Sequence, residues 1–177
     1  EIVRMFYEVL GEWIVQPFDE DQTQCFVFER ANAQYKNKDI NLVKDGIHFV
    51  WPHIVCPFSF QLKVRSEMLK KLKQSGIFTK MNLYKQTVSD IYDLDVIEGS
   101  WMMYGSCKPK HKPYKLTHIL QYTVDDDGED DIKDIEIDWE QYTNAYLIRI
   151  LSMRNRSDSR VTFQIHKERE IVELETK

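Results

Sequence analysis

The chain has 177 residues, of which 42% are hydrophobic, so it can bury one core of ordinary size and we predict a single domain over residues 1–177. It has no apolar run of the roughly 20 residues that cross a bilayer and no signal-peptide pattern at Glu1, which predicts a soluble intracellular protein without a membrane partner. The net charge of −5 is concentrated in residues 125–140, where ten acidic residues and one lysine sum to −9, so the remaining chain carries +4 and a nucleic-acid partner is not excluded.

The first third of the chain is predicted to form a helix and then two paired strands. Apolar residues recur at helical intervals from Ile2 to Ile14, so the chain opens with an amphipathic helix that ends near Pro17. Residues 24–29 are aromatic and β-branched, which predicts a strand, and a polar loop over residues 32–41 leads to a second strand at residues 46–50. We expect these two strands to pair.

The rest of the chain predicts further helices and strands of one α+β fold. Apolar residues at helical spacing predict a helix over residues 59–74 that ends at Gly76. Residues 101–104 and 114–124 predict strands, and residues 142–153 predict a late helix. We therefore expect a mixed or antiparallel sheet with flanking helices and a cleft at the strand ends.

Two acidic segments look like metal motifs, but we interpret both as loops. Residues 125–131 are expected to be a solvated surface loop, with a calcium site as the weaker alternative, because their single glycine does not fit the spacing of an EF-hand. Residues 18–21 mimic a hydrophobic-Asp-x-Asp motif, but they follow Pro17 and no strand precedes them. The three cysteines, Cys25, Cys56 and Cys107, lack CxxC spacing, which predicts reduced and mostly buried thiols.

His48 is the first candidate for function. It stands in an apolar run, and an imidazole at the end of a strand can donate a hydrogen bond to a phosphate oxygen. Gly46, two residues earlier, has no Cβ and so allows a ligand or a second backbone to approach. The alternative is a histidine that is simply hydrogen-bonded within the edge of the strand.

Asp93 is the second candidate. It follows an apolar pair, so it could project from the end of a strand into a cleft, where a carboxylate suits Mg²⁺ or Mn²⁺. Asp95 competes for the same role, and the alternative for either carboxylate is a turn or a cap.

Residues 104–115 carry four lysines among aromatic and turn residues. Their ammonium groups and backbone amides could bind a triphosphate or a nucleic-acid backbone, with Ser106 and Lys108 as candidate contacts. The alternative is a solvated hairpin turn.

Several of these segments together resemble a known family. They are residues 44–48 with Trp51-Pro52, Asp93 with Val96, residues 101–106 with Lys108-Pro109, and residues 113–116, in that order. This succession resembles the primase domain of the primase–helicases of large DNA viruses, within the archaeo-eukaryotic primase superfamily. The resemblance runs from about Gln24 to Leu120, and residues 151–154 match a later segment more weakly.

The resemblance implies a DNA-replication primase that makes primers from nucleoside triphosphates on a single-stranded DNA template, with Mg²⁺ or Mn²⁺ as cofactor. It implies that Gly46 and His48 contact the phosphates of the incoming nucleotide and that Asp93 helps to hold the metal. It also implies a fold with an RNA-recognition-like core, a helicase domain in the same polypeptide, and action in the host cytoplasm or nucleus.

One departure from the family pattern limits these expectations. The family's first motif, which supplies two further carboxylates, should lie upstream of the opening helix, so we expect the 177 residues to be part of a longer catalytic domain and inactive alone, because one aspartate cannot hold two metal ions. Two alternatives from other classes stay open: a catalytically silent nucleic-acid-binding module, and a protein-interaction domain that uses the acidic loop.

Overall fold

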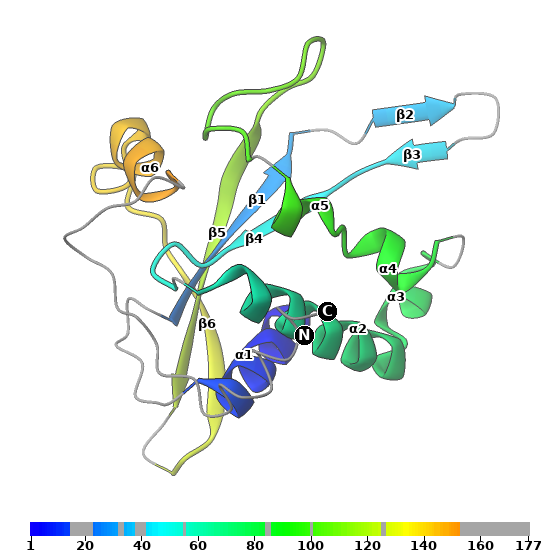
Figure 1. Ribbon diagram of the computed structural model, residues 1–177. Helices are drawn as coiled ribbons and strands as arrows, with labels where there is room; N and C mark the ends of the chain where they lie inside the picture. Colours follow the sequence, from blue (N-terminus) through cyan, green and yellow to red (C-terminus); the bar gives the residue numbers. More distant parts are fainter. Residues whose placement is uncertain are drawn as a thin grey trace. The chain divides into compact units, whose positions relative to one another are not determined.

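The computed structural model describes residues 1–14, 23–31, 34–37, 42–54, 56–83, 86–99, 101–124 and 127–152 (Figure 1). These residues form two compact units, each assembled from segments that are distant in the sequence. The helical unit contains the described residues of Glu1–Pro17 and Ile54–Trp101, and the sheet unit contains those of Phe18–His53 and Met102–Ser159. Because each unit is described by itself, the expectation of a single domain stays a prediction.

Two long helices, α1 (Ile2–Trp13) and α2 (Phe58–Ser75), form the core of the helical unit. Both are amphipathic, and α2 buries one side chain every four residues along a single stripe, as a helix with 3.6 residues per turn requires. The stripe consists of Phe60, Val64, Met68 and Leu72. Helix α2 ends where Gly76 adopts a left-handed φ of 62°, a backbone conformation that favours glycine.

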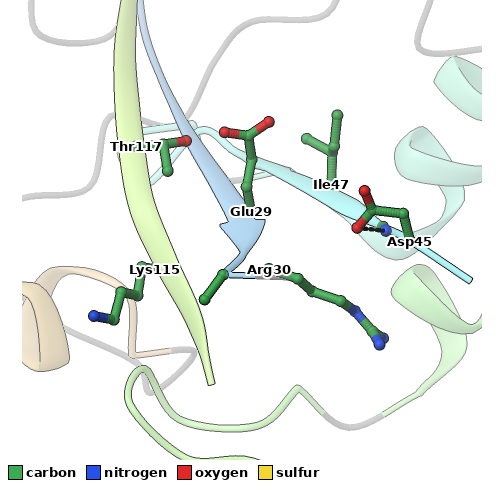
Figure 2. A pocket seen from close by; sticks show the side chains of 8 residues that line it. Glu29, Arg30, Asp45, Ile47, Lys115 and Thr117 are labelled. Atoms are coloured by element: carbon green, nitrogen blue, oxygen red, sulfur yellow. Dashed lines mark hydrogen bonds between the residues drawn. The ribbon is translucent and has the colours of Figure 1, made fainter. Parts of the chain in front are cut away.

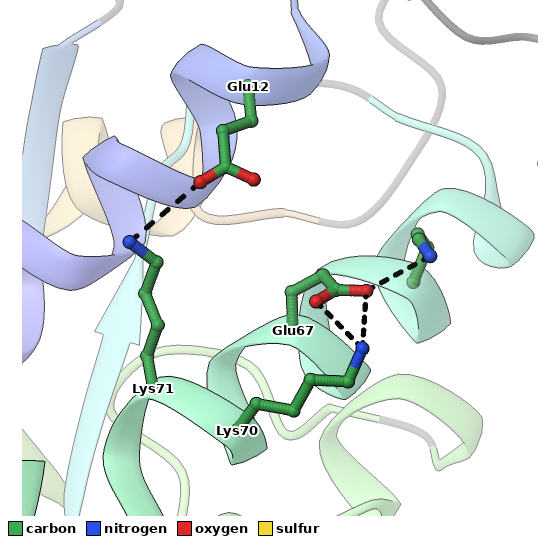
Figure 3. A network of polar contacts seen from close by, with 5 residues as sticks. Glu12, Glu67, Lys70 and Lys71 are labelled. Carbon is green, nitrogen blue, oxygen red and sulfur yellow. Dashed lines mark hydrogen bonds and ion pairs between the residues drawn. The ribbon is translucent and has the colours of Figure 1, made fainter. Parts of the chain in front are cut away.

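Polar contacts join the solvent side of these two helices (Figure 3). The Lys71 ammonium lies 2.8 Å from a Glu8 carboxylate oxygen and 3.8 Å from one of Glu12, and Glu67 pairs with Lys63 and Lys70 within α2. The Lys63 ammonium also lies 4.7 Å from the centre of the Trp13 ring. Such exposed pairs contribute at most about 1 kcal/mol each, so the buried stripe is the larger source of stability.

Three short helices complete the helical unit: α3 (Ile77–Lys80), α4 (Val88–Ile91) and α5 (Asp95–Glu98). Thr87 and Asp90 begin α4 with a capping box, in which each side chain bonds the backbone N–H of the other residue. Within the described residues, no helix is both long and apolar enough to cross a membrane.

The sheet unit contains a four-stranded sheet in the order β4-β1-β5-β6, and every pair of neighbours is antiparallel. Its strands are β1 (Gln24–Arg30), β4 (Ile47–Val50), β5 (Tyr114–Val124) and β6 (Asp130–Ile135). A separate hairpin pairs β2 (Gln34–Asn37) with β3 (Leu42–Lys44). The central strands β1 and β5 therefore have hydrogen-bonded neighbours on both sides.

One face of this sheet packs against α6 (Asn144–Ile150). A bulge in β5 opposite Val27 and Phe28 adds one residue to that strand, so that Leu116 and Ile119, three residues apart, are both buried in this core. The other core residues are Phe26, Phe28, Tyr142, Leu147 and Ile150.

Most of the predicted elements are confirmed. The class is α+β with an antiparallel sheet, the two predicted strands pair as β1 and β4, and the predictions for α1, α2 and β5 agree with the structure to within a few residues. The late helix is present as α6, and the structure does not describe Met153. Residues 18–21, which we predicted to be a loop, also lie outside the described residues.

Three predictions of local structure were wrong. Residues 101–104 form no strand, because the chain there enters a turn in which the Ser106 amide donates to the Met103 carbonyl. The predicted loop over residues 32–41 contains β2, and the predicted acidic loop gives way to β6 at Asp130. Both of these strands are paired, and strand pairing overrode the polar composition of the two segments.

All three cysteines are free thiols, as predicted, but they differ in exposure. Burial raises the pKa of Cys25 far above its ordinary value and that of Cys56 to about 11, whereas Cys107 is exposed. The expectation of mostly buried thiols is therefore wrong for Cys107, which lies in the segment of residues 104–115 that carries four lysines.

Candidate functional site

His48 lies in β4 at an edge of the four-stranded sheet, opposite Phe28 of β1. Residues directly opposite each other in an antiparallel pair share one face, so the imidazole emerges on the face that carries buried Phe28. His48 is half-buried at the margin of this core. It thus combines a partly apolar environment with access to solvent.

Tyr114 links the imidazole to Arg30. The rings of His48 and Tyr114 are stacked, with their centres 4.0 Å apart and their planes 17° from parallel. The Arg30 Nε donates a hydrogen bond of 2.6 Å to the Tyr114 hydroxyl, and the guanidinium carbon lies 4.9 Å from the centre of the tyrosine ring. We call these three residues the His48 stack.

Gly46 accommodates the same tyrosine. A Cβ added at Gly46 would lie 2.7 Å from the Tyr114 hydroxyl oxygen, which is closer than real Cβ contacts occur. Gly46 and His48 are two residues apart in an extended segment, so one tyrosine ring covers both positions. The space that we expected to serve an approaching ligand is therefore taken up by Tyr114.

The environment of His48 favours a neutral imidazole. Burial lowers the pKa of His48 below its ordinary value of 6.5, and the positive charge of Arg30 lowers it further. The ring can therefore donate or accept a hydrogen bond near neutral pH, while Arg30 supplies the permanent charge.

A pocket of about 300 Å³ lies beside the stack, at the end of β1 and the start of β4 (Figure 2). It is lined by Glu29, Arg30, Ala31, Asp45, Gly46, Ile47, Lys115 and Thr117. The volume is at the lower end of the range for small-molecule sites. His48 does not line this pocket, whereas Arg30 and Gly46 belong to both places.

A second histidine, His118 of β5, lies among carboxylates. Its Nδ1 is 2.7 Å from an Asp134 oxygen and its Nε2 is 4.0 Å from a Glu29 oxygen. The residue is opposite Val27 in the register, whereas His48 is opposite Phe28, so the two histidines leave the sheet on opposite faces. His118 is therefore not part of the His48 stack.

Asp93 lies in the helical unit between α4 and α5, so the expectation that it projects from the end of a strand was wrong. Its Oδ1 accepts a hydrogen bond of 3.0 Å from the Asp95 amide, which matches the turn or cap alternative. The backbone before it is held by Arg65, whose Nη2 donates to the Tyr92 carbonyl at 2.7 Å. Asp93 is itself exposed, so an anchored backbone presents its carboxylate to solvent.

Ser106 and Lys108 lie in an exposed basic hairpin, defined here as residues 102–113. The Ser106 hydroxyl donates to the Met103 carbonyl, and the His111 amide donates to the Lys108 carbonyl at 3.0 Å, so two successive turns shape this segment. Lys108, Lys110 and Lys112 are all exposed. Figure 1 shows the hairpin extending away from the start of β5.

Comparison with known proteins identifies the family to which the chain belongs. Residues 1–120 match the family described as the C962R protein N-terminal AEP domain, where AEP stands for archaeo-eukaryotic primase. The chain belongs to this family.

This AEP domain also resembles a viral protein named "Putative helicase 184R", from Invertebrate iridescent virus 6. The two are 24% identical over 134 residues, which cover 68% of this chain and 14% of the relative. The chain thus spans a small part of that relative's length. The predicted resemblance to viral primase–helicases is confirmed at the level of the family.

The described residues of the AEP domain contain no group of three or more His, Cys, Asp or Glu side chains that could hold a metal ion. Asp93 alone does not fit the six oxygen ligands that Mg²⁺ requires. His48 and Asp93 belong to different units. The expectation that His48 contacts the phosphates of a nucleotide while Asp93 helps to hold its metal therefore stays a prediction.

Arg30 was not among the predicted site residues. The signal for it was present in the pairing of the two strands, because a register that sets Phe28 opposite His48 also sets Arg30 opposite Gly46 on the same face. Continuing the register along the neighbouring strand would therefore have identified it.

The lowered pKa of His48 predicts a pH dependence of stability. The unfolded chain binds the proton at about pH 6.5, and the folded chain only at lower pH, so the stabilisation is complete above pH 6.5 and is lost as the pH falls through the folded pKa. We expect His48→Gln to abolish this part of the decrease in the free energy of unfolding, measured by denaturant titration from pH 7.5 to 5. The exposed His111→Gln variant is the matched control, and equal profiles for His48→Gln and the native chain would contradict the prediction.

The close approach of Tyr114 predicts that Gly46→Ala destabilises the sheet unit by about 1–3 kcal/mol, the usual cost of overpacking. Replacing Tyr114 by Leu removes the hydroxyl that the new Cβ would meet. In a double-mutant cycle measured by denaturant unfolding, Gly46→Ala should therefore cost less in the Tyr114→Leu background. Equal costs in both backgrounds would show that the tyrosine hydroxyl does not limit position 46.

Proposed function

We propose that this AEP domain takes part in metal-dependent, template-directed synthesis of primers from nucleoside triphosphates. The observation that carries the proposal is the His48 stack, which combines a neutral imidazole with a guanidinium in a chain of the archaeo-eukaryotic primase family. An imidazole donor and a fixed positive charge are the groups that bind phosphate oxygens.

In this proposal, His48 contacts the phosphates of the incoming nucleotide, and Gly46 allows Tyr114 to hold the ring in place. Ser106 and Lys108 supply further phosphate contacts from the basic hairpin. Asp93 provides one oxygen ligand for Mg²⁺ or Mn²⁺, and other carboxylates must complete the coordination. Ions held there would neutralise the charge that develops as a 3′-hydroxyl oxygen bonds to the α-phosphorus and the bond to the departing pyrophosphate breaks.

The wider role is that of a viral primase–helicase acting on single-stranded DNA. The name of the viral relative supports a helicase domain in the same polypeptide, and its source supports action at the site of viral replication in the host cell. The family match supports primase chemistry, since the family is named for an archaeo-eukaryotic primase domain.

A second candidate function is nucleic-acid binding without synthesis, and the basic hairpin favours it. From Gly99 to Val124 the chain has no acidic residue but four lysines, at positions 108, 110, 112 and 115. Exposed Met102 and Met103 provide apolar surface beside them. This combination suits a single strand, whose backbone is charged and whose bases are apolar on their faces.

The first proposal predicts that a fluorescent ATP analogue binds the chain more tightly with Mn²⁺ than without it, and that His48→Gln weakens this binding roughly tenfold or more, as loss of a hydrogen bond to a charged group does. Fluorescence titration measures both effects, with His118→Gln, on the opposite face of the sheet, as the control for losing an imidazole elsewhere. Absence of binding to the native chain, or unchanged binding to His48→Gln, would refute the proposed site.

The second candidate predicts that Lys110→Gln/Lys112→Gln weakens binding of a fluorescent single-stranded oligonucleotide, followed by anisotropy. In a plot of the logarithm of the affinity against the logarithm of the salt concentration, the steepness of the line should decrease by roughly 0.7 for each phosphate that the variant no longer neutralises. The exposed pair Lys73→Gln/Lys80→Gln changes the net charge equally in the helical unit and is the matched control. Equal slopes for both double variants would argue against the hairpin as the binding surface.

A further inference from the structure

We propose that Arg30 is a second phosphate-binding residue of the nucleotide site and that Tyr114 is the positioning residue that joins it to His48. This inference rests on the proposed function, because it assigns further residues to the same site. It comes from contacts between three strand residues, of which only Tyr114 and His48 lie in segments that suggested the family. The ligand group is the polyphosphate of a nucleoside triphosphate.

The Tyr114 ring fixes the spacing between the two candidate phosphate-binding groups. The imidazole stacks on the ring at 4.0 Å, and the guanidinium carbon lies 4.9 Å from the same ring centre. Because both distances are measured from the same ring centre, the guanidinium carbon and the centre of the imidazole are at most 8.9 Å apart, a separation that a triphosphate can span. Each is also held in orientation, His48 by the stack and Arg30 by its hydrogen bond to the hydroxyl.

Arg30 suits a polyphosphate better than Lys115, the other cation that lines the pocket. Its guanidinium is planar and permanently charged, and with Nε bonded to Tyr114 the plane is fixed while the other N–H groups form a fork that matches phosphate oxygens. Lys115 lines the same pocket, but its ammonium is a compact charge without such a fork. Figure 2 shows the Glu29 and Arg30 side chains leaving the end of β1 in different directions.

The neighbouring carboxylates also favour a ligand on the His48 side. Asp45 and Glu29 both line the pocket, and Asp45 Oδ1 accepts a hydrogen bond from the Gly46 amide at 2.8 Å. His48 lies outside that lining, on the face shared with Phe28. A polyphosphate that spans Arg30 and His48 thus lies along the edge of the sheet and keeps its charge away from Glu29.

The test measures binding of the fluorescent ATP analogue with Mn²⁺ to the full chain carrying Arg30→Gln, Arg30→Lys or Tyr114→Phe. We expect Arg30→Gln to weaken binding roughly tenfold or more, since it removes a charge-assisted hydrogen bond, and Arg30→Lys to recover part of the affinity. Tyr114→Phe keeps the ring and removes the hydroxyl, so its effect should be smaller. Exposed Arg149→Gln, on α6 of the same unit, is the matched control for charge.

Inorganic tripolyphosphate should compete with the analogue for the native chain and less well for Arg30→Gln.

A second readout separates phosphate binding from a merely structural role. Histidine ring signals followed by NMR should show the pKa of His48 rising in Arg30→Gln, because the neighbouring charge is removed, while thermal unfolding shows the chain still folded. Native-like affinity of Arg30→Gln, together with weak binding by His48→Gln, overturns this inference and leaves the proposed function standing. No binding to the native chain overturns both.

Discussion

The pairing of β1 with β4 and β5 is the constraint on which the site depends. The register between β1 and β5 sets Arg30 opposite Tyr114, and the register between β1 and β4 sets Phe28 opposite His48. Because side chains alternate between faces, a slip by one residue would move each of them to the wrong face. Phe26 and Phe28 oppose such a slip, since both are buried in the core beneath α6 and would lose that burial.

This arrangement divides two tasks between two side chains. The margin of a hydrophobic core lowers the proton affinity of His48, so its ring serves as a neutral, oriented hydrogen-bonding group. Arg30 carries the charge and is not discharged by the same environment, because a guanidinium stays protonated in proteins. Tyr114 connects the two, with its apolar ring on the imidazole and its hydroxyl on the guanidinium.

The sequence predicted those parts of the fold whose pattern is periodic and local. Helix α2 shows its buried stripe and its terminal Gly76 directly, and β1 and β5 are rich in strand-forming residues. Strand β6 was missed because acidic residues dominate it. Its two isoleucines, Ile132 and Ile135, lie on opposite faces, and Ile135 packs against the core, so it is pairing with β5 that defines the strand. We predicted that Asp93 follows a strand, although Thr87 and Asp90 form a capping box, which signals the start of a helix. The stack of His48 on Tyr114 joins residues far apart in sequence, so no local pattern could predict it.

Strand β5 also explains why the net charge is a poor guide to this domain. The basic hairpin comes before Tyr114, the first residue of β5. The acidic residues that lead into β6 come after Val124, the last residue of β5. A strand of 11 residues spans about 36 Å at roughly 3.3 Å per residue, which is several times the Debye length of about 8 Å at physiological ionic strength. The acidic residues at the far end of β5 therefore do not neutralise the lysines of the basic hairpin, although β6 runs back along β5 and brings Asp134 opposite Leu120. This local distribution of charge fits the nucleotide site that we propose at the end of the sheet that carries Arg30 and the lysines.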